Sequence, residues 1–318
     1  MCPSPEQKLP ASRFAKVPAG TLHYLEWGEP PARAARDRVI VLVHGTAFAA
    51  SIWHPVATCL AAEGYTVVAF DRRAHGRTAI ESAALDFSDF ADDVLAFTDV
   101  LGLARVHGVG HSAGGTDLLL AAGRRPELFA TVVAMEPTIM DPDRSRSVEP
   151  GLSPASREYL DRVRARRAQF ASREDAREHF AARAPYRTWR PDVLGLFLLQ
   201  GLADTASGVR LGCRAEDEAR MLEPILQAME RRHGVSGEAG QSPFEALRRV
   251  VCPVRLIANR VSLPYHTMTQ LAETLLPGVG SMIEWELGHC SPMEDPPTVA
   301  DRILSFLSEH VLARTTTS

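Results

Sequence analysis

One serine stands in a context that could make it a nucleophile. Ser112 lies in the motif GHSAG, residues 110–114, directly after a β-branched apolar run at 104–110 and directly before a helical pattern at 113–123. A strand, a sharp turn and a helix in this order expose a serine hydroxyl at the carboxyl edge of a sheet, and the glycines give the turn its clearance. The motif alone also fits a glycine-rich helix entry, but in this context we predict a nucleophile.

A histidine far along the chain could serve as its general base. His289 follows the apolar run 281–286 and precedes a loop that leads into the last helical pattern. From the carboxyl end of a strand, an imidazole can reach a serine at the same edge of the sheet. Among the ten other histidines, His75 and His111 fit turn or packing positions. No matching context is found for His23, His54, His107, His179, His233, His266 and His310. We therefore predict His289 as the base.

Backbone donors for an oxyanion are predicted at two positions. His44, Gly45 and Thr46 follow the apolar run 39–43. The turn that they form would bring the Thr46 N–H near the N–H of Ala113, and two such donors can bind a developing oxyanion. A simple turn is the alternative for a His-Gly pair after a strand. Paired with the serine motif, the oxyanion hole is the favoured interpretation.

The elements that must position these groups alternate along the chain. Short apolar runs rich in β-branched residues recur in the first half, and helical patterns of longer period separate them. This alternation is typical of βαβ units, which build a mostly parallel sheet with helices on both faces. We predict an α/β fold with an eight-stranded sheet. Before residue 137 we predict six strands. The first is a short one near residue 13, and the others are at 21–27, 38–45, 66–71, 104–110 and 131–136.

The alternation stops after residue 137 and resumes at residue 250. The sequence between these points is rich in Arg, Glu and Ala, is helical in pattern and contains no convincing strand. The last two strands are predicted at 251–259 and 281–286, and each precedes a helix. We therefore predict a core domain of residues 1–137 and 248–318, with a helical insertion at residues 138–247.

Composition and charge exclude several classes of protein. The 318 residues are 45% hydrophobic and 23% charged, as in ordinary globular proteins. The net charge of −4 gives no electrostatic footprint for nucleic acid. No apolar run reaches the roughly 18 residues of a membrane span, and the N-terminal residues do not resemble a signal peptide. We therefore expect a cytoplasmic protein without a membrane span or a nucleic-acid partner.

The cysteines point the same way. There are five, an odd number, and none is spaced as CxxC. This argues against a disulfide framework and against a zinc site, and favours a reducing compartment.

Together these motifs resemble the α/β-hydrolase superfamily. The resemblance rests on HGTAFAAS followed by Trp53, on DRRAHGRT, on GHSAGG and on GHCSPMEDP, and it covers roughly the first 137 and the last 70 residues. It implies Ser112 as nucleophile, His289 as base and the backbone of Thr46 and Ala113 as oxyanion hole. It also implies that the insertion is a cap over the pocket, and that neither a metal nor an organic cofactor takes part.

The acid that completes a triad is where this chain departs from the superfamily's usual pattern. Most members carry an aspartate in the turn after strand seven, but Ser262 stands there, and no carboxylate lies between Arg248 and Glu273. A minority of members place the acid at the end of strand six, 24 residues after the nucleophile, where this chain has Glu136. A Glu-Pro pair at that point is structural in relatives that keep the later aspartate. Because position 262 lacks a carboxylate, we predict Glu136 as the acid.

These residues favour hydrolysis of a carboxylic ester or lactone by a Ser-His-Glu triad through an acyl-enzyme. A serine in place of an aspartate disfavours epoxide hydrolases and haloalkane dehalogenases, which need a carboxylate nucleophile. Two alternatives stay open: a cofactor-independent lyase or other biosynthetic enzyme on this scaffold, and a small-molecule receptor that hardly turns over. The substrate and the oligomeric state, a homodimer included, are not determined.

The insertion raises two further alternatives. Ten arginines at 157–190 stand among acidic residues, which fits a solvated face with i,i+4 ion pairs better than a dock for an anionic substrate. The apolar run 193–202 fits the core of the cap better than the wall of an acyl pocket.

Overall fold

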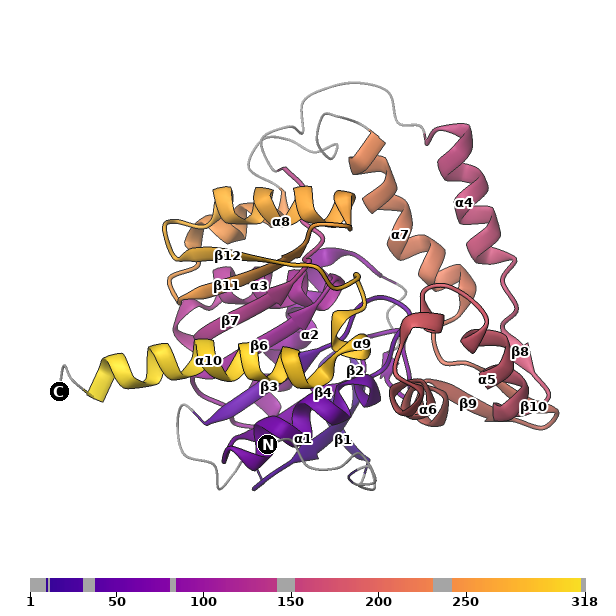
Figure 1. Ribbon diagram of the computed structural model, residues 1–318, viewed down its shortest axis with the longest axis horizontal. Helices are drawn as coiled ribbons and strands as arrows, with labels where there is room; N and C mark the ends of the chain where they lie inside the picture. The colour runs from indigo at the N-terminus through magenta and orange to yellow at the C-terminus, as the bar shows by residue number, and fades with distance from the viewer. Residues whose placement is uncertain are drawn as a thin grey trace.

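The fold is built on one large sheet. The computed structural model describes residues 10, 12–30, 38–80, 84–141, 152–230 and 242–315. Eight strands follow the order β1-β2-β4-β3-β6-β7-β11-β12, and the short β5 pairs with β2. Pairing is antiparallel between β1 and β2 and between β2 and β4, and parallel from β4 to β12. The predicted α/β fold with a mostly parallel eight-stranded sheet is confirmed (Figure 1).

The strands of this sheet are short and most are apolar. Their bounds are β1 Arg13–Val17, β2 Gly20–Trp27, β3 Val39–Val43, β4 Thr66–Phe70, β5 Ala79–Ile80, β6 Val106–His111, β7 Phe129–Met135, β11 Val254–Asn259 and β12 Gly280–Trp285. The helices of the core are α1 His54–Ala62, α2 Phe87–Val100, α3 Ala113–Arg124, α8 Leu263–Leu275, α9 Ser291–Glu294 and α10 Pro296–Thr315.

Both faces of the sheet are covered, and the central strands are therefore apolar throughout. Every residue of β3, β4, β6 and β7 is buried. Successive side chains of a strand point to opposite faces. Ile40 and Leu42 accordingly pack in one hydrophobic cluster with α1 and α10, while Val41 and Val43 pack in a second cluster with α2, α3 and α8 (Figure 1).

The segment between β7 and β11 contains four helices and a small sheet. The helices are α4 Pro154–Arg164, α5 Arg173–Ala181, α6 Pro191–Gln200 and α7 Ala215–Glu230, and the strands are β8 Gln169–Phe170, β9 Leu202–Thr205 and β10 Gly208–Leu211. Figure 1 shows them together, to the right of the large sheet. The strands pair in the order β8-β10-β9.

The prediction that the insertion lacks strands was therefore wrong. β8 has only two residues. In the β9–β10 hairpin, Asp204 and Thr205 are both exposed, whereas an amphipathic strand would alternate exposed and buried residues. Without that alternation, the sequence gives no period-two signal.

The cysteines differ from the sequence expectation in one respect. Cys59 in α1 is disulfide-bonded, whereas Cys213, Cys252 and Cys290 are free and buried. The partner of Cys59 lies outside the described residues. This bond weakens the argument for a reducing compartment.

Candidate active site

Ser112 occupies a strained turn between β6 and α3. Its backbone adopts φ 53° and ψ −125°, a conformation that side-chain-bearing residues rarely take. The Ser112 N–H donates to the carbonyl of Met135 at 2.8 Å, which ties the turn to the end of β7. The side chain is nearly buried, with the residue 9% exposed. A strained turn at a serine directly after a central parallel strand is the geometry that a nucleophile elbow requires.

Two glycines allow this turn to form. A Cβ at Gly110 would lie 2.5 Å from the carbonyl oxygen of Gly114, and a Cβ at Gly114 would lie 2.3 Å from the carbonyl oxygen of Val43. Both neighbours are backbone atoms and cannot swing aside. The glycines of the motif are therefore required by the close approach of α3 to β6 and β3.

Gly114→Ala should destabilise the protein although the position is helical. Helix propensity alone favours alanine by about 1 kcal/mol, but the overlap with backbone should cost about 3 kcal/mol. Gly195 in α6 is the matched control, because its added Cβ would meet only the flexible end of Arg177. Urea unfolding should show a loss of stability for Gly114→Ala and none for Gly195→Ala. Equal behaviour of the two variants would contradict this explanation.

His289 and Glu136 form a hydrogen-bonded pair at the carboxyl ends of the strands. The Nδ1 of His289 lies 2.7 Å from Oε2 of Glu136. Glu136 directly follows β7, is fully buried, and accepts a second hydrogen bond on Oε1 from the Asn259 N–H at 3.2 Å. The His289 side chain is 23% exposed and follows β12 in the loop before α9. The two predicted residues are thus brought together, 153 positions apart in the sequence.

His289 is also close to the serine turn. The His111 ring, which belongs to the residue before Ser112, lies 4.8 Å from the ring of His289. Its Nε2 donates to the His289 carbonyl oxygen at 2.7 Å. Burial, followed by repulsion from His289, lowers the pKa of His111 well below its ordinary value. His111 is thus a neutral packing residue that links the serine turn to the histidine loop.

Tyr265 is a site residue that the sequence did not reveal. It lies in the first turn of α8, and its ring stacks on the His289 imidazole with centroids 3.8 Å apart and planes 12° from parallel. Glu136 holds one edge of the imidazole while Tyr265 covers one face, so the ring orientation is fixed in two directions. No motif marks Tyr265, because the packing of α8 alone brings it to the histidine.

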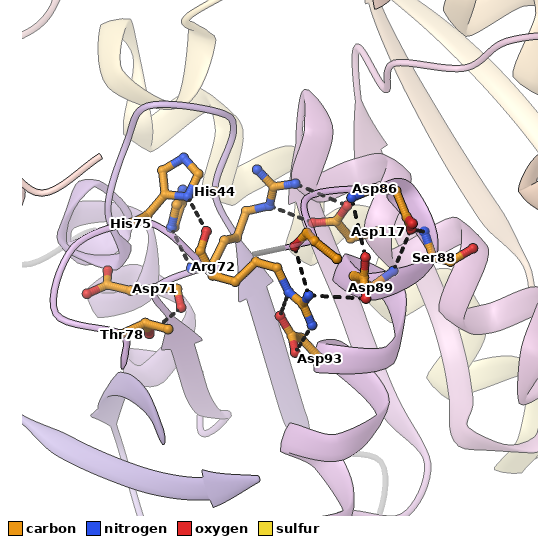
Figure 2. Close-up of polar contacts among 12 residues, drawn as sticks. His44, Asp71, Arg72, His75, Thr78, Asp86, Ser88, Asp89, Asp93 and Asp117 are labelled. Carbon is orange, nitrogen blue, oxygen red and sulfur yellow. Dashed lines mark hydrogen bonds and ion pairs between the residues drawn. The ribbon is translucent and has the colours of Figure 1, made fainter. Parts of the chain in front are cut away.

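Thr46 and Ala113, the two predicted oxyanion donors, line one small cavity. The loop that carries Thr46 is held by two buried histidines. His44 Nε2 accepts from the Arg72 N–H at 3.0 Å, and His75 Nε2 accepts from the Ala47 N–H at 2.9 Å. Figure 2 shows His44 and His75 side by side next to Arg72. Both rings accept on Nε2 and are therefore neutral.

Acid should unfold the protein partly through these two rings. Burial first, then repulsion from His75, lowers the pKa of His44 to about 3, and burial followed by repulsion from Arg72 does the same for His75. Between about pH 6.5 and 3 the unfolded chain binds more protons than the folded protein does. The free energy of unfolding therefore decreases as the pH is lowered, by about 1.4 kcal/mol per pH unit for each ring. From about pH 7 to pH 5, each ring should cost about 2 kcal/mol.

Urea unfolding of His75→Gln checks this expectation. The variant keeps a donor and an acceptor but cannot take up a proton. Its stability loss between about pH 7 and pH 5 should be about 2 kcal/mol smaller than that of the parent chain. An unchanged pH dependence would show that His75 does not titrate in this way.

The inserted segment packs over this edge of the sheet. Phe197 of α6 joins an aromatic cluster with Phe48, Tyr186 and Trp189, next to the loop that follows β3. Val193, Leu194 and Leu198 are buried too, which favours the interpretation of run 193–202 as core.

Most arginines of the insertion are occupied by carboxylates. Ion pairs with nearby acids involve Arg162, Arg164, Arg166, Arg167, Arg173, Arg177 and Arg190. This favours the solvated face over a dock for an anionic substrate.

Two absences concern the described residues only. Residues 10–315, without the undescribed gaps, contain no group of three or more His, Cys, Asp or Glu that could hold a metal ion. In the same part of the chain, no helix combines the length and the apolar character that a membrane crossing needs.

Comparison with known proteins gives a consistent family. The sequence profile of the Alpha/beta hydrolase family matches residues 40–302. The chain is 32% identical over 122 residues to a bifunctional esterase/perhydrolase of Acinetobacter calcoaceticus, covering 37% of this chain and 42% of that protein. It is 30% identical over 154 residues to a non-heme chloroperoxidase of Streptomyces lividans, covering 47% and 53%. The chain thus spans about half of the length of these curated relatives.

Solved structures agree over most of the chain. The structure of E-2-(acetamidomethylene)succinate hydrolase superposes with a TM-score of 0.70 at 21% identity, covering 94% of this chain and 99% of that one. The enol-lactonase from Burkholderia xenovorans LB400 gives a TM-score of 0.65 at 18% identity, covering 93% and 100%. At these sequence identities, the similarity to the two solved structures shows a shared fold and nothing beyond it.

Proposed function

The chain belongs to the α/β-hydrolase family, and from this premise we propose that it hydrolyses a carboxylic ester or lactone through an acyl-enzyme. The observation that carries the proposal is the 2.7 Å contact between His289 Nδ1 and Glu136, beside the strained turn of Ser112. A nucleophile, a base and an orienting carboxylate at one sheet edge are the components of a hydrolytic triad.

Each group has a defined role in this proposal. Ser112 Oγ attacks the carbonyl carbon while His289 Nε2 takes the hydroxyl proton and then gives it to the leaving group. Water, deprotonated by the same nitrogen, cleaves the acyl-enzyme and regenerates the serine. Glu136 accepts from Nδ1–H, keeps Nε2 free to accept, and stabilises the imidazolium. The N–H groups of Thr46 and Ala113 bind the oxyanion.

The acid is proposed at Glu136 rather than in the turn after β11. Ser262 offers no carboxylate there, and Glu136 is buried with both oxygens engaged, one by His289 and one by the Asn259 N–H. The strand order supports this assignment, because β7 directly neighbours the nucleophile strand β6.

Residues 138–247 are proposed as the cap of the site, on a core of residues 1–137 and 248–318. The cavity next to Thr46 and Ala113 is closed by Met221, Pro224 and Ile225 of α7, so the inserted segment would shape the acyl pocket. The partner is then a small-molecule ester or lactone.

A panel of p-nitrophenyl acyl esters, lactones and thioesters tests the proposal. Multiple turnovers of at least one class are expected, and a fluorophosphonate should abolish them by labelling Ser112. Labelling without any turnover would favour the receptor alternative. Conversion without net hydrolysis would favour the lyase alternative.

A further inference from the structure

Two consecutive arginines follow β4 and are buried near the proposed oxyanion hole. Arg72 and Arg73 are 2% and 3% exposed, and each donates hydrogen bonds to an aspartate. Arginines are almost never buried to this degree unless they are paired. Since both have a partner, what distinguishes them is whether that partner satisfies the whole guanidinium.

Arg73 is fully engaged. Its Nε and Nη2 donate to the two oxygens of Asp93 at 2.6 and 2.8 Å. Its Nη1 donates to the carbonyl oxygen of Ala84 at 3.1 Å and lies 3.2 Å from Asp89 Oδ1. All three nitrogens therefore have partners, and the role of Arg73 is structural.

Arg72 is engaged only in part. Its Nε and Nη2 donate to Asp117 at 2.6 and 3.3 Å, and one face of the guanidinium stacks on Phe90 at 4.0 Å. Its Nη1 is buried and has no hydrogen-bond partner among the described residues. A buried donor left without a partner costs about 1 to 3 kcal/mol, and more on a charged group. Such a cost at one of two adjacent arginines suggests that a ligand supplies the missing acceptor.

The cavity beside Arg72 identifies where that ligand would lie. Arg72 lines the same cavity as Thr46 and Ala113, so a substrate with its carbonyl oxygen between those two N–H groups extends next to the guanidinium. No carboxylate stands among the described residues that line the cavity, whose remaining walls are apolar. The amino end of α3, at Ala113, adds positive potential.

From this arrangement we propose that Arg72 binds a carboxylate on the acyl part of the substrate, which makes the enzyme selective for half-esters or lactones of short dicarboxylic acids. This inference rests on the proposed function. Arg72 would be a substrate-binding residue, with Asp117 fixing its guanidinium and Nη1 directed at the substrate. Guanidinium forks suit carboxylates for this purpose.

The cavity must widen to accept such a group. Its volume of about 10 Å³ holds about one water molecule. Met221, Pro224 and Ile225 of α7 cover it, and a methionine side chain adapts readily to a new shape. Entry of the acyl group therefore requires a shift of α7 side chains, Met221 first. A cavity that holds only water is the competing outcome.

The test compares an anionic and a neutral ester of similar length, mono-p-nitrophenyl glutarate and p-nitrophenyl pentanoate. The variant is Arg72→Met/Asp117→Leu, in which neither charge is left unpaired. The matched control is Arg73→Met/Asp93→Leu, which removes an equally buried pair away from the cavity. We expect the ratio of kcat/KM for glutarate over pentanoate to fall about 10- to 100-fold in the Arg72 variant. The control should keep the parental ratio.

The inference would be overturned if the parent chain showed no preference for the glutarate ester, or if the Arg72 variant kept that preference. Either result would leave the proposed ester hydrolysis standing. Calorimetric binding of glutarate against uncharged glutaramide to the parent chain needs neither turnover nor a folded variant. Tighter binding of glutarate supports the anion site, and equal binding overturns it. If neither ester is hydrolysed, the proposed function fails, and the calorimetry still decides whether the anion site exists.

Discussion

Ser112→Ala is expected to lower kcat on the best ester by about 1,000-fold or more, with the fold intact. The loss is large because the serine acts as a unit with its base, so removing the nucleophile disables the covalent route as a whole. Circular dichroism and urea unfolding should match the parent, because only one nearly buried hydroxyl is removed. Residual hydrolysis would come from the oxyanion donors and substrate binding.

Ser51→Ala is the matched control for this result. Ser51 is fully buried, and its Oγ has no hydrogen-bond partner in the described part of the chain. Its loss should leave kcat close to the parental value.

Adding His289→Ala to Ser112→Ala should lower kcat little further than Ser112→Ala alone, since the catalytic unit is already disabled. Multiplying losses, or full activity of Ser112→Ala, would contradict the shared role.

Glu136→Gln should lower kcat by about 1,000- to 10,000-fold, the effect typical of a triad acid replaced by its amide. The reason lies in its two hydrogen bonds. One side-chain oxygen accepts from the Asn259 backbone N–H, a group that can only donate. The other oxygen accepts from His289 Nδ1. Glutamine has a single oxygen. When that oxygen faces Asn259, the amide NH₂ faces His289 and forces Nδ1 to accept, which places the proton on Nε2.

Glu294→Gln provides the matched control. Glu294 ends α9, directly after the histidine loop, and its carboxylate accepts from the Gly288 N–H at 3.0 Å and from the Thr188 hydroxyl at 2.6 Å. Its loss should change kcat by less than about tenfold, because no proton on the imidazole depends on it. The readout is kcat on the same ester, with thermal unfolding to verify the fold. Nearly full activity of Glu136→Gln would show that the acid is misplaced.

The residues of the candidate site that the sequence predicts share one property. Thr46, Ser112 and His289 follow predicted strands and Glu136 ends one, and parallel strands place their carboxyl ends at one edge of the sheet. A strand signal followed by a polar residue is therefore enough to gather them. The position of Glu136 next to His289 depends in addition on the strand order, which follows from the family resemblance.

What the sequence misses is set by packing between helices. Tyr265 reaches His289 only because α8 lies along β11 and β12. Arg72 gains its place from Asp117, 45 residues later in α3. Neither contact leaves a periodic pattern in the sequence. Each depends on how close two elements lie in the fold, whereas a sequence pattern describes one helix or strand at a time. The sequence marks Arg72 only as part of the motif DRRAHGRT and of a run of three charged residues, 71–73, directly after a buried strand.

The central claim is an acyl-enzyme on Ser112, and rapid-quench mass spectrometry during turnover of a p-nitrophenyl ester tests it directly. Esters with an activated leaving group make deacylation the slow step, so the intermediate should accumulate. We predict a mass increase equal to the acyl group, located on the peptide that contains Ser112, formed in a burst with p-nitrophenol and absent from Ser112→Ala. Steady turnover with no adduct, or an adduct on another residue, would contradict the proposed mechanism.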